Sequence, residues 1–283
     1  MSALHRWFLV ALFLMGIVST AAAEEALFSA PKDYLLALGD SLTFGFQRAR
    51  FLANPDPSNF TTGFVDDFAR RLTATAPGRS TRVVNFGCPD ETTGSFLVGP
   101  CAYHALFSLH NNFEGSQIDA AEAFLATHRG RVGPILISLG ANDALAAVLR
   151  CGGLNLECIS ALLPDILATI VANYGEILGR LRAAAPNAEI VVLVLYNPLA
   201  VINPLSNVLA AVINQAIEAV ATANRARIAN PFVAFDLALP QPQTLCALTL
   251  FCTPLQDIHP TDQGYQVISD LVWAASGYAR FER

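Results

Sequence analysis

Residues 34–45 of the chain read YLLALGDSLTFG. The run 34–38 is continuously apolar, which is typical of a strand that is buried on both faces. Gly39, Asp40 and Ser41 follow, and these residue types favour a tight turn that leads into a helix. Ser41 is thereby expected at the carboxyl end of a strand, where N–H groups of the next turn can stabilise an oxyanion. Taken alone, the same residues favour a simpler interpretation, a turn in which Asp40 or Ser41 only caps a helix.

Further strands are predicted downstream, and most are near-continuous runs of Val, Ile and Leu. The predicted strands are 34–38, 82–86, 134–139, 189–195 and 232–235, and the predicted helices are 63–74, 117–127, 163–184, 207–229 and 261–276. Strands that alternate with helices indicate an α/β fold with a parallel sheet between layers of helices. In such sheets the ligand site lies beyond the carboxyl ends of the strands.

The first 23 residues have the layout of a secretory signal peptide. Arg6 supplies the positive charge, residues 7–18 are apolar, and residues 21–23 offer an A-x-A cleavage site. The apolar run is too short to cross a bilayer comfortably, and an uncleaved signal anchor is the alternative. We therefore expect one domain over residues 24–283 that is secreted or periplasmic, without integral membrane association after cleavage.

Composition narrows the range of partners. Hydrophobic residues make up 53% of the chain, and the formal net charge is −6 at pH 7. The basic residues are dispersed rather than clustered, which argues against nucleic acid and anionic membrane surfaces as partners. We expect a monomer that acts on a small molecule.

Six cysteines fall into three close pairs. The pairs are Cys88 and Cys101, Cys151 and Cys158, and Cys246 and Cys252. An even number of cysteines in an exported chain predicts disulfides, and pairing between nearest neighbours is the most economical of the possible connectivities. A zinc site is the alternative, but no Cys-x-x-Cys occurs and few histidines lie near these cysteines. We expect three disulfides and no metal.

The predicted topology brings the residues that follow each strand to one edge of the sheet. They are Ser41, Gly87, residues 140–143, Asn197 and, before the last helix, residues 257–260. A serine, backbone donors, an amide and a histidine would then lie together. Acyl transfer from an ester requires this set of groups.

At these positions the sequence resembles the GDSL-type esterases and lipases, also called SGNH hydrolases. The resemblance is carried by Gly39-Asp40-Ser41-Leu42, by Gly87 after Val83-Val84-Asn85-Phe86, by Gly140-Ala141-Asn142-Asp143, and by His259-Pro260. The blocks occur in the order of the family over residues 36–265. The resemblance implies a flavodoxin-like three-layer α/β/α sandwich with a five-stranded parallel sheet, in agreement with the alternation of strands and helices.

The resemblance also implies roles for individual residues. Ser41 would be the nucleophile, and His259 would be the base that a serine hydroxyl needs. The oxyanion hole would comprise the backbone N–H groups of Ser41 and Gly87 and the side-chain amide of Asn142. A Cβ at position 87 would crowd the acyl oxygen. For Asp143 a helix-capping role is the better interpretation. No cofactor is implied.

One position departs from the family. The family usually places an aspartate three residues before the histidine, and Gln256 occupies that position here. Asp257 lies two residues before His259, and in an extended stretch residues two apart point to the same side. Asp257 is thus one candidate for orienting the imidazole. The carbonyl or side chain of Gln256 is the other.

These observations predict an exported serine ester hydrolase that works through an acyl-serine intermediate. A non-catalytic module that binds carbohydrate or a surface is an alternative, and a flavin-binding flavodoxin-like protein is another. Lipid, phospholipid, acetylated glycan and aryl esters all remain open as substrates. Residues 96–98 and 199–205 are candidates for the wall of an acyl pocket, although core packing explains them equally well.

Overall fold

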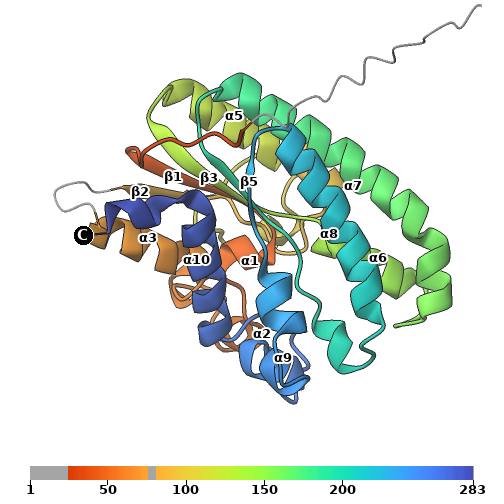
Figure 1. Ribbon diagram of the computed structural model, residues 1–283. Coiled ribbons are helices and arrows are strands. Elements are labelled where there is room, and N and C mark those ends of the chain that lie inside the picture. Colours follow the sequence, from red (N-terminus) through yellow and green to blue (C-terminus); the bar gives the residue numbers. More distant parts are fainter. Residues whose placement is uncertain (1–24, 76–80, 283) are drawn as a thin grey trace, which may run out of the picture.

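A five-stranded parallel sheet forms the centre of the molecule, in the order β2-β1-β3-β4-β5 (Figure 1). The structure, a computed structural model, describes residues 25–75 and 81–282. The predicted signal peptide, residues 1–23, lies outside the described residues. The strands are β1 (Tyr34–Gly39), β2 (Arg82–Asn85), β3 (Val132–Ser138), β4 (Ile190–Leu193) and β5 (Arg227–Ala229).

Helices cover both faces of this sheet because successive residues of each strand point to opposite sides. In β1, Leu36 and Leu38 pack into a cluster with residues of α5, α7 and α8, whereas Leu35 and Ala37 pack into a second cluster with residues of α3 and α10. The predicted three-layer α/β/α sandwich is therefore confirmed (Figure 1). The long helices are α3 (Phe64–Thr75), α5 (Gln117–Thr127), α7 (Leu156–Ala184), α8 (Ser206–Ala223) and α10 (Asp262–Ser276).

Shorter helical segments occupy the loops of the sandwich. The α-helices among them are α1 (Ser41–Phe44), α2 (Arg48–Ala53), α4 (Thr93–Val98), α6 (Ala141–Arg150) and α9 (Gln243–Leu248). The 3-10 segments are η1 (Pro57–Asn59), η2 (Ala102–Ala105), η3 (Pro198–Val201), η5 (Leu250–Cys252) and η6 (Tyr278–Phe281), and η4 (Val233–Leu237) is a π-helical turn. Several of these segments follow the carboxyl ends of strands, so they surround the edge at which the site was expected.

The predicted position of the fifth strand is wrong. Residues 232–235 begin the helical segment that contains η4, and β5 lies inside the stretch 207–229 that was predicted as helix. Helix α8 ends at Ala223, Arg225 adopts a φ of 57°, and the guanidinium of Arg182 donates to the carbonyls of Asn224 and Arg225 at 2.9 Å each. These bonds satisfy backbone groups at the end of the helix, and the alanine-rich sequence gave no sign of them.

Helix α7 is long and apolar enough to cross a membrane by length and composition alone. Its side chains at a helical spacing, Ile170, Tyr174, Ile177 and Leu181, are nevertheless fully buried against the sheet. One stripe of α7 therefore packs on the sheet, whereas only 11% of its apolar 18-residue window is buried.

The three predicted disulfides are present. Cys88 pairs with Cys101, Cys151 with Cys158, and Cys246 with Cys252. Each bond closes a short loop at the carboxyl edge of the sheet or next to it, so each restrains local geometry. Such bonds are typical of proteins from oxidising compartments.

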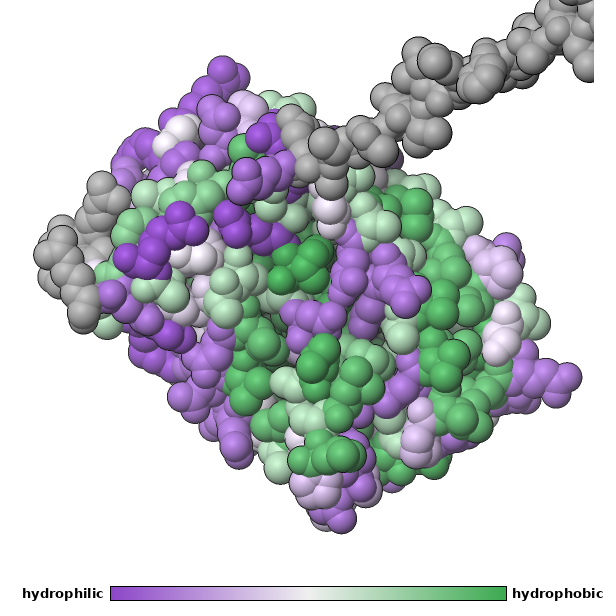
Figure 2. Space-filling model, viewed as in Figure 1, coloured by the Kyte–Doolittle hydropathy of each residue, from purple (hydrophilic) through white to green (hydrophobic). Residues whose placement is uncertain are grey.

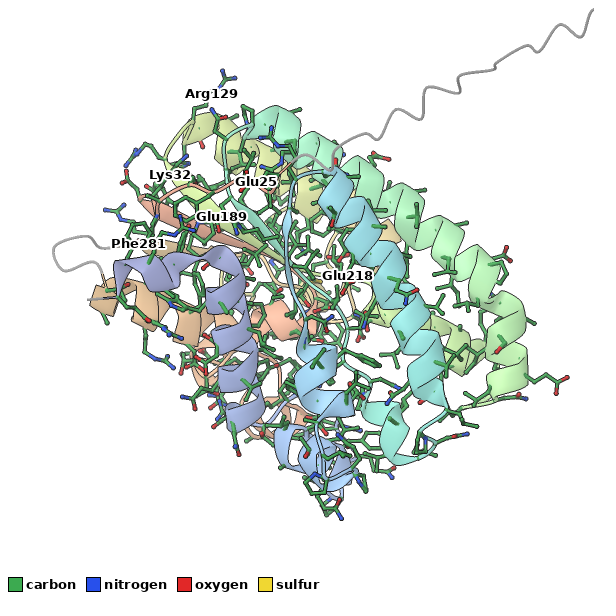
Figure 3. All side chains as sticks on the ribbon, viewed as in Figure 1. Glu25, Lys32, Arg129, Glu189, Glu218 and Phe281 are labelled. Atoms are coloured by element: carbon green, nitrogen blue, oxygen red, sulfur yellow. A yellow bond between two sulfur atoms is a disulfide. The ribbon has the colours of Figure 1, made fainter. Side chains whose placement is uncertain are left out.

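A buried acidic residue lies at the opposite edge of the sheet, where the strands begin. Glu189, which immediately precedes β4 and is labelled in Figure 3, is fully buried and lies 3.4 Å from the guanidinium of Arg227. It also accepts the Ser29 N–H at 3.2 Å. Burial raises the pKa of Glu189 to about 7. The hydrogen bond from Ser29 and the ion pair with Arg227 thus join the N-terminal segment and β5 through Glu189.

Candidate active site

The turn after β1 is shaped by Gly39 and Asp40. Gly39 has a φ of 130°, and a Cβ at this position would overlap the carbonyl oxygen of Ser138 in β3. Asp40 accepts the Leu42 N–H at 3.0 Å and the Ser138 hydroxyl at 3.2 Å, so it caps α1 and joins it to the sheet. Burial raises the pKa of Asp40 to about 7. Ser41 is therefore the first residue of a short helix, and its backbone N–H has no partner within that helix.

Ser41 and His259 are in contact although 218 positions separate them: Ser41 Oγ lies 2.9 Å from His259 Nε2. On the other side of the ring, His259 Nδ1 lies 2.5 Å from Asp257 Oδ1. The backbone N–H of Arg48 donates to Asp257 Oδ2 at 2.7 Å. The structure thus brings Ser41, His259 and Asp257 into one hydrogen-bonded chain.

Asp257, and not Gln256, contacts the imidazole. Gln256 adopts a φ of 45°, and its N–H donates to the Thr253 carbonyl at 2.9 Å. Burial raises the pKa of Asp257, but hydrogen bonds from His259 and Arg48 outweigh burial, and the net pKa lies below its ordinary value. A carboxylate that stays ionised in this position holds the ring and stabilises it when it becomes protonated.

The loop that carries His259 is held by its backbone carbonyls. The Tyr196 hydroxyl donates to the Ile258 carbonyl at 2.7 Å, and the Leu250 N–H donates to the His259 carbonyl at 2.8 Å. The Gln47 amide donates to the Pro260 carbonyl at 2.9 Å. Three successive peptide groups are therefore anchored, which fixes the position of the imidazole relative to Ser41.

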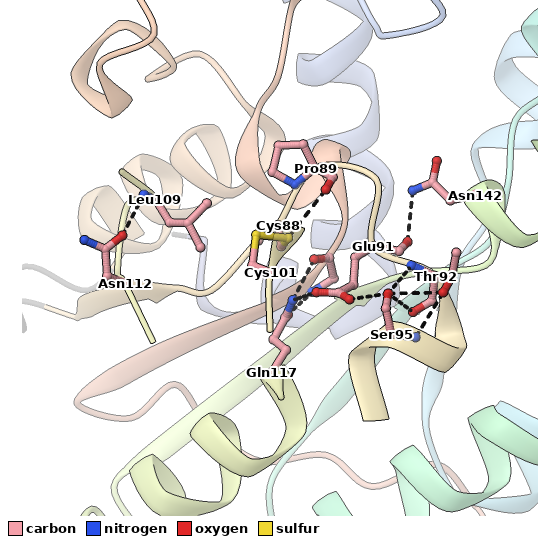
Figure 4. Close-up of a disulfide and its surroundings, with 12 residues drawn as sticks. Cys88, Pro89, Glu91, Thr92, Ser95, Cys101, Leu109, Asn112, Gln117 and Asn142 are labelled. Atoms are coloured by element: carbon pink, nitrogen blue, oxygen red, sulfur yellow. Dashed lines mark hydrogen bonds between the residues drawn. A yellow bond between two sulfur atoms is a disulfide. The ribbon is translucent and has the colours of Figure 1, made fainter. Parts of the chain in front are cut away.

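Asn142 lies in the first turn of α6 and lines the same cavity as Ser41 and His259. Its side-chain amide donates to the carbonyl of Glu91 at 2.9 Å (Figure 4). A primary amide has two N–H donors, so one remains to bind an oxygen in the cavity. The bond to Glu91 sets the direction in which that second donor points.

Gly87, predicted to contribute its N–H to the oxyanion hole, lies in the loop after β2. Its N–H already donates to the Asn85 side-chain oxygen at 2.8 Å, and Gly87 does not line the cavity. A Cβ at this position would lie 2.5 Å from the backbone nitrogen of Phe44. Glycine is required here because the loop after β2 passes close to the nucleophile turn, rather than because of the acyl oxygen. The part of this loop beside Asn142 is the turn of Asp90, whose φ is 63°, and Glu91.

The prediction that Asp143 caps its own helix is wrong. Asp143 does not bond its own helix but accepts the Thr93 N–H at 2.9 Å and the Thr93 hydroxyl at 2.7 Å. It thereby holds the N-terminus of α4 against α6. The sequence gave no means of telling a local cap from one that serves another helix.

The sequence model of the GDSL-like Lipase/Acylhydrolase family matches residues 37–267. The chain belongs to this family. It is an ester-hydrolysing enzyme, and its α/β fold is that of solved family members. No curated protein is significantly similar to the chain in sequence.

Solved structures with the same fold include two esterases of different kinds. The lipase Lip_vut3 from a goat rumen metagenome is 19% identical with a TM-score of 0.59, and the match covers 88% of this chain and 99% of that one. The acetylxylan esterase Axe2 from Geobacillus stearothermophilus is 17% identical with a TM-score of 0.54, covering 90% of this chain and 98% of that one. At these identities the likeness concerns the fold alone.

In this GDSL hydrolase a buried polar network supports the turn that carries Ser41. No sequence motif predicted this network. The fully buried Gln117 receives the Gly39 N–H at 2.5 Å and donates to the Gly39 carbonyl at 3.0 Å. Its amide also donates to Glu91 at 3.1 Å, and Ser95 donates to the same carboxyl group (Figure 4). Burial raises the pKa of Glu91 to about 7. One network thus joins the strand before Ser41 to the turn that Asn142 holds.

A cavity of about 890 Å³, including the space at its open mouth, begins at Ser41. Of the expected wall residues 199–205, Leu199 lines it and residues 200–205 do not. Residues 96–98 do not line it either: Phe96 and Leu97 are core residues and Val98 is 86% exposed. Within residues 25–75 and 81–282, no group of histidine, cysteine and acidic side chains is arranged to hold a metal ion.

Proposed function

We propose that this GDSL hydrolase is an exported serine esterase that works through an acyl-serine intermediate. The observation that carries the proposal is the hydrogen-bonded chain from Ser41 Oγ through His259 to Asp257. A serine hydroxyl is a weak nucleophile at neutral pH, and a base within hydrogen-bond reach is what activates it.

In the proposed reaction His259 takes the proton of Ser41 as the hydroxyl oxygen attacks the ester carbonyl. The Ser41 N–H and the free N–H of Asn142 stabilise the tetrahedral oxyanion. His259 then gives the proton to the departing alcohol, which leaves an acyl group on Ser41. Water then gives a proton to the same imidazole and attacks the acyl-serine; the bond to Ser41 Oγ breaks, the carboxylic acid leaves, and His259 returns the proton to Ser41. Asp257 acts through His259 by holding its ring in one tautomer.

Export is supported by two features that are independent of the site. The sequence of residues 1–23 has the pattern of a cleavable secretory signal, and all six cysteines of the chain are paired. The mature protein would then be a single domain over residues 24–283. Its substrate is a small-molecule, lipid or glycan ester.

Labelling of Ser41 by a fluorophosphonate tests the proposal. We expect the wild-type protein to be labelled and to hydrolyse p-nitrophenyl esters, and Ser41→Ala to lose both properties. Ser108→Ala, which changes an exposed serine, is the control and should behave as wild type. A folded protein that is neither labelled nor active would instead indicate a binding module on the same scaffold.

A further inference from the structure

The cavity beside Ser41 is lined mainly by apolar side chains from three segments. These are helix α6, the loop between α6 and α7, and the stretch from β4 into α8. The apolar lining residues include Ala144, Leu145 and Val148 from the first segment, Leu154 and Ile159 from the second, and Leu199, Leu209, Ala210 and Ile213 from the third. The disulfide Cys151–Cys158 restrains the second segment. The apolar wall therefore extends well beyond the residues that contact the ester group itself.

The polar side chains in the wall already have partners. Both N–H groups of the Asn197 amide are used, by Ser206 Oγ at 2.8 Å and by Asn207 Oδ1 at 2.7 Å. The Ser206 hydroxyl donates to the Asn203 carbonyl at 2.8 Å, and the Tyr196 hydroxyl donates to Ile258. These donors are therefore not free to bind the hydroxyl groups of a sugar.

The position of the cavity relative to Ser41 and His259 indicates which half of an ester it holds. His259 must deliver its proton to the alcohol oxygen, so the alcohol lies on the His259 side of the reacting carbon. The carbonyl oxygen points toward Asn142 in the oxyanion hole, and we assign the remaining direction, along the apolar wall of α6 and α8, to the acyl chain. Ala144, Leu145 and Val148 continue the wall in that direction.

On the basis of the proposed function, we propose that this cavity holds the aliphatic acyl chain of the substrate, and that the preferred chains are longer than butanoyl. An acetyl group would fill only the part beside Ser41 and would leave the remaining apolar wall in contact with water.

The segments that line the cavity also carry apolar side chains that are exposed to solvent. Leu149, Ile202, Leu205 and Val208 are exposed by 61–80%, and each lies within a few residues of one that lines the cavity. Figure 2 shows hydrophobic residues gathered over the lower part of this face, around α9. An apolar approach of this kind suits an ester that carries a hydrocarbon chain better than a soluble glycan.

A pair of isomeric esters tests the direction of the cavity. Ethyl octanoate and octyl acetate contain the same atoms, but the long chain is on the acyl side in the first and on the alcohol side in the second. We expect kcat/KM for ethyl octanoate, measured by titration of the released acid, to be at least about tenfold higher. Equal values, or faster hydrolysis of octyl acetate, would overturn the inference.

The length dependence is measured with p-nitrophenyl acetate, butanoate, hexanoate and octanoate. Each methylene that enters the apolar wall should raise kcat/KM about fourfold. Acetylated xylo-oligosaccharide, measured alongside, should be a poor substrate. A preference for acetate or for the sugar ester would also overturn the inference.

Two matched pairs of variants test whether the acyl chain of the substrate binds in this cavity. Ala210→Phe and Ala144→Phe fill the cavity, and each should lower the ratio of octanoate to acetate kcat/KM at least about tenfold. Ala219→Phe and Ala146→Phe introduce the same side chain at exposed positions of the same helices and should leave the ratio unchanged. Equal ratios in all four variants would contradict the assignment.

The outcomes separate this inference from the function on which it rests. If Ser41 is labelled and acetate is the best substrate, the enzyme is a serine esterase and only the acyl-chain assignment fails. If no ester is hydrolysed and Ser41 is not labelled, the proposed function itself fails.

Discussion

Asp257 Oδ1 lies 2.5 Å from His259 Nδ1, and a single residue, Ile258, stands between them in the chain. The resemblance to GDSL hydrolases had suggested an acid one residue earlier, where Gln256 stands. The shorter spacing works because Asp257 and His259 lie on the same side of the chain, and because the Arg48 N–H fixes the second carboxylate oxygen. The geometry that the imidazole needs is thus reached with a different spacing.

The substitution Asp257→Asn should lower kcat by about 10³–10⁴-fold, because an amide favours the wrong tautomer of His259. Steady-state kinetics with a p-nitrophenyl ester measures the loss, and circular dichroism should be unchanged. Gln256→Asn is the control, since asparagine tolerates the positive φ of this position. It should hydrolyse the ester at close to the wild-type rate. A larger loss in the control than in Asp257→Asn would assign the orienting role to residue 256.

Neighbouring substitutions in α6 should have different effects. Asn142→Ala removes a donor from the proposed oxyanion hole and should lower kcat by about 10²–10³-fold with little change in KM. Asp143→Ala leaves the Thr93 N–H without its carboxylate and should lower the free energy of unfolding by about 1–3 kcal/mol. Kinetics and urea unfolding of both variants distinguish the two roles. Unchanged kcat in Asn142→Ala would exclude its amide from the reaction.

Gly87→Ala should destabilise the fold by about 1–3 kcal/mol, because the added Cβ would crowd the backbone at Phe44. Gly99→Ala is the matched control, since its Cβ would meet the Ser95 carbonyl oxygen only at 3.6 Å, an ordinary contact. Urea unfolding provides both values. Equal stability of Gly87→Ala and wild type would show that the loop can move aside.

Glu91 should make stability depend on pH. Because burial raises its pKa from 4.5 to about 7, the folded state binds the proton more tightly than the unfolded state does. The contribution of Glu91 is therefore complete below pH 4.5 and is lost as the pH rises through about 7. The total is at most about 3 kcal/mol.

The side chain of the variant Glu91→Gln does not ionise. As the pH rises, the unfolding free energy of wild type should therefore fall relative to that of the variant. Urea unfolding at several pH values between 4 and 8 measures the shift. Glu114→Gln, at an exposed position, should leave the pH dependence of wild type unaltered. A pH-independent difference for Glu91→Gln would indicate that folding does not shift the pKa of Glu91.

Patterns that depend on neighbours along the chain were predictable. The apolar run before Gly39 predicted β1, the alternation of strands and helices predicted the sandwich, and the close spacing of the cysteines predicted their pairing. The rule that strand ends converge predicted the contact between Ser41 and His259. In contrast, the segment after α8 is held by Arg182, which belongs to a different helix, and the position predicted for β5 is wrong.

The sequence by itself determined the order of the elements and which polar groups arrive at the carboxyl edge of the sheet, because hydrophobic periodicity and parallel topology are properties of the chain alone. Only the tertiary structure decided which of those groups are free. Gly87 is committed to Asn85, Asp143 to Thr93, and one N–H of Asn142 to Glu91. The partners of Asp143 and Asn142 lie in the segment that contains Glu91 and Thr93, which meets α6 only in the folded molecule.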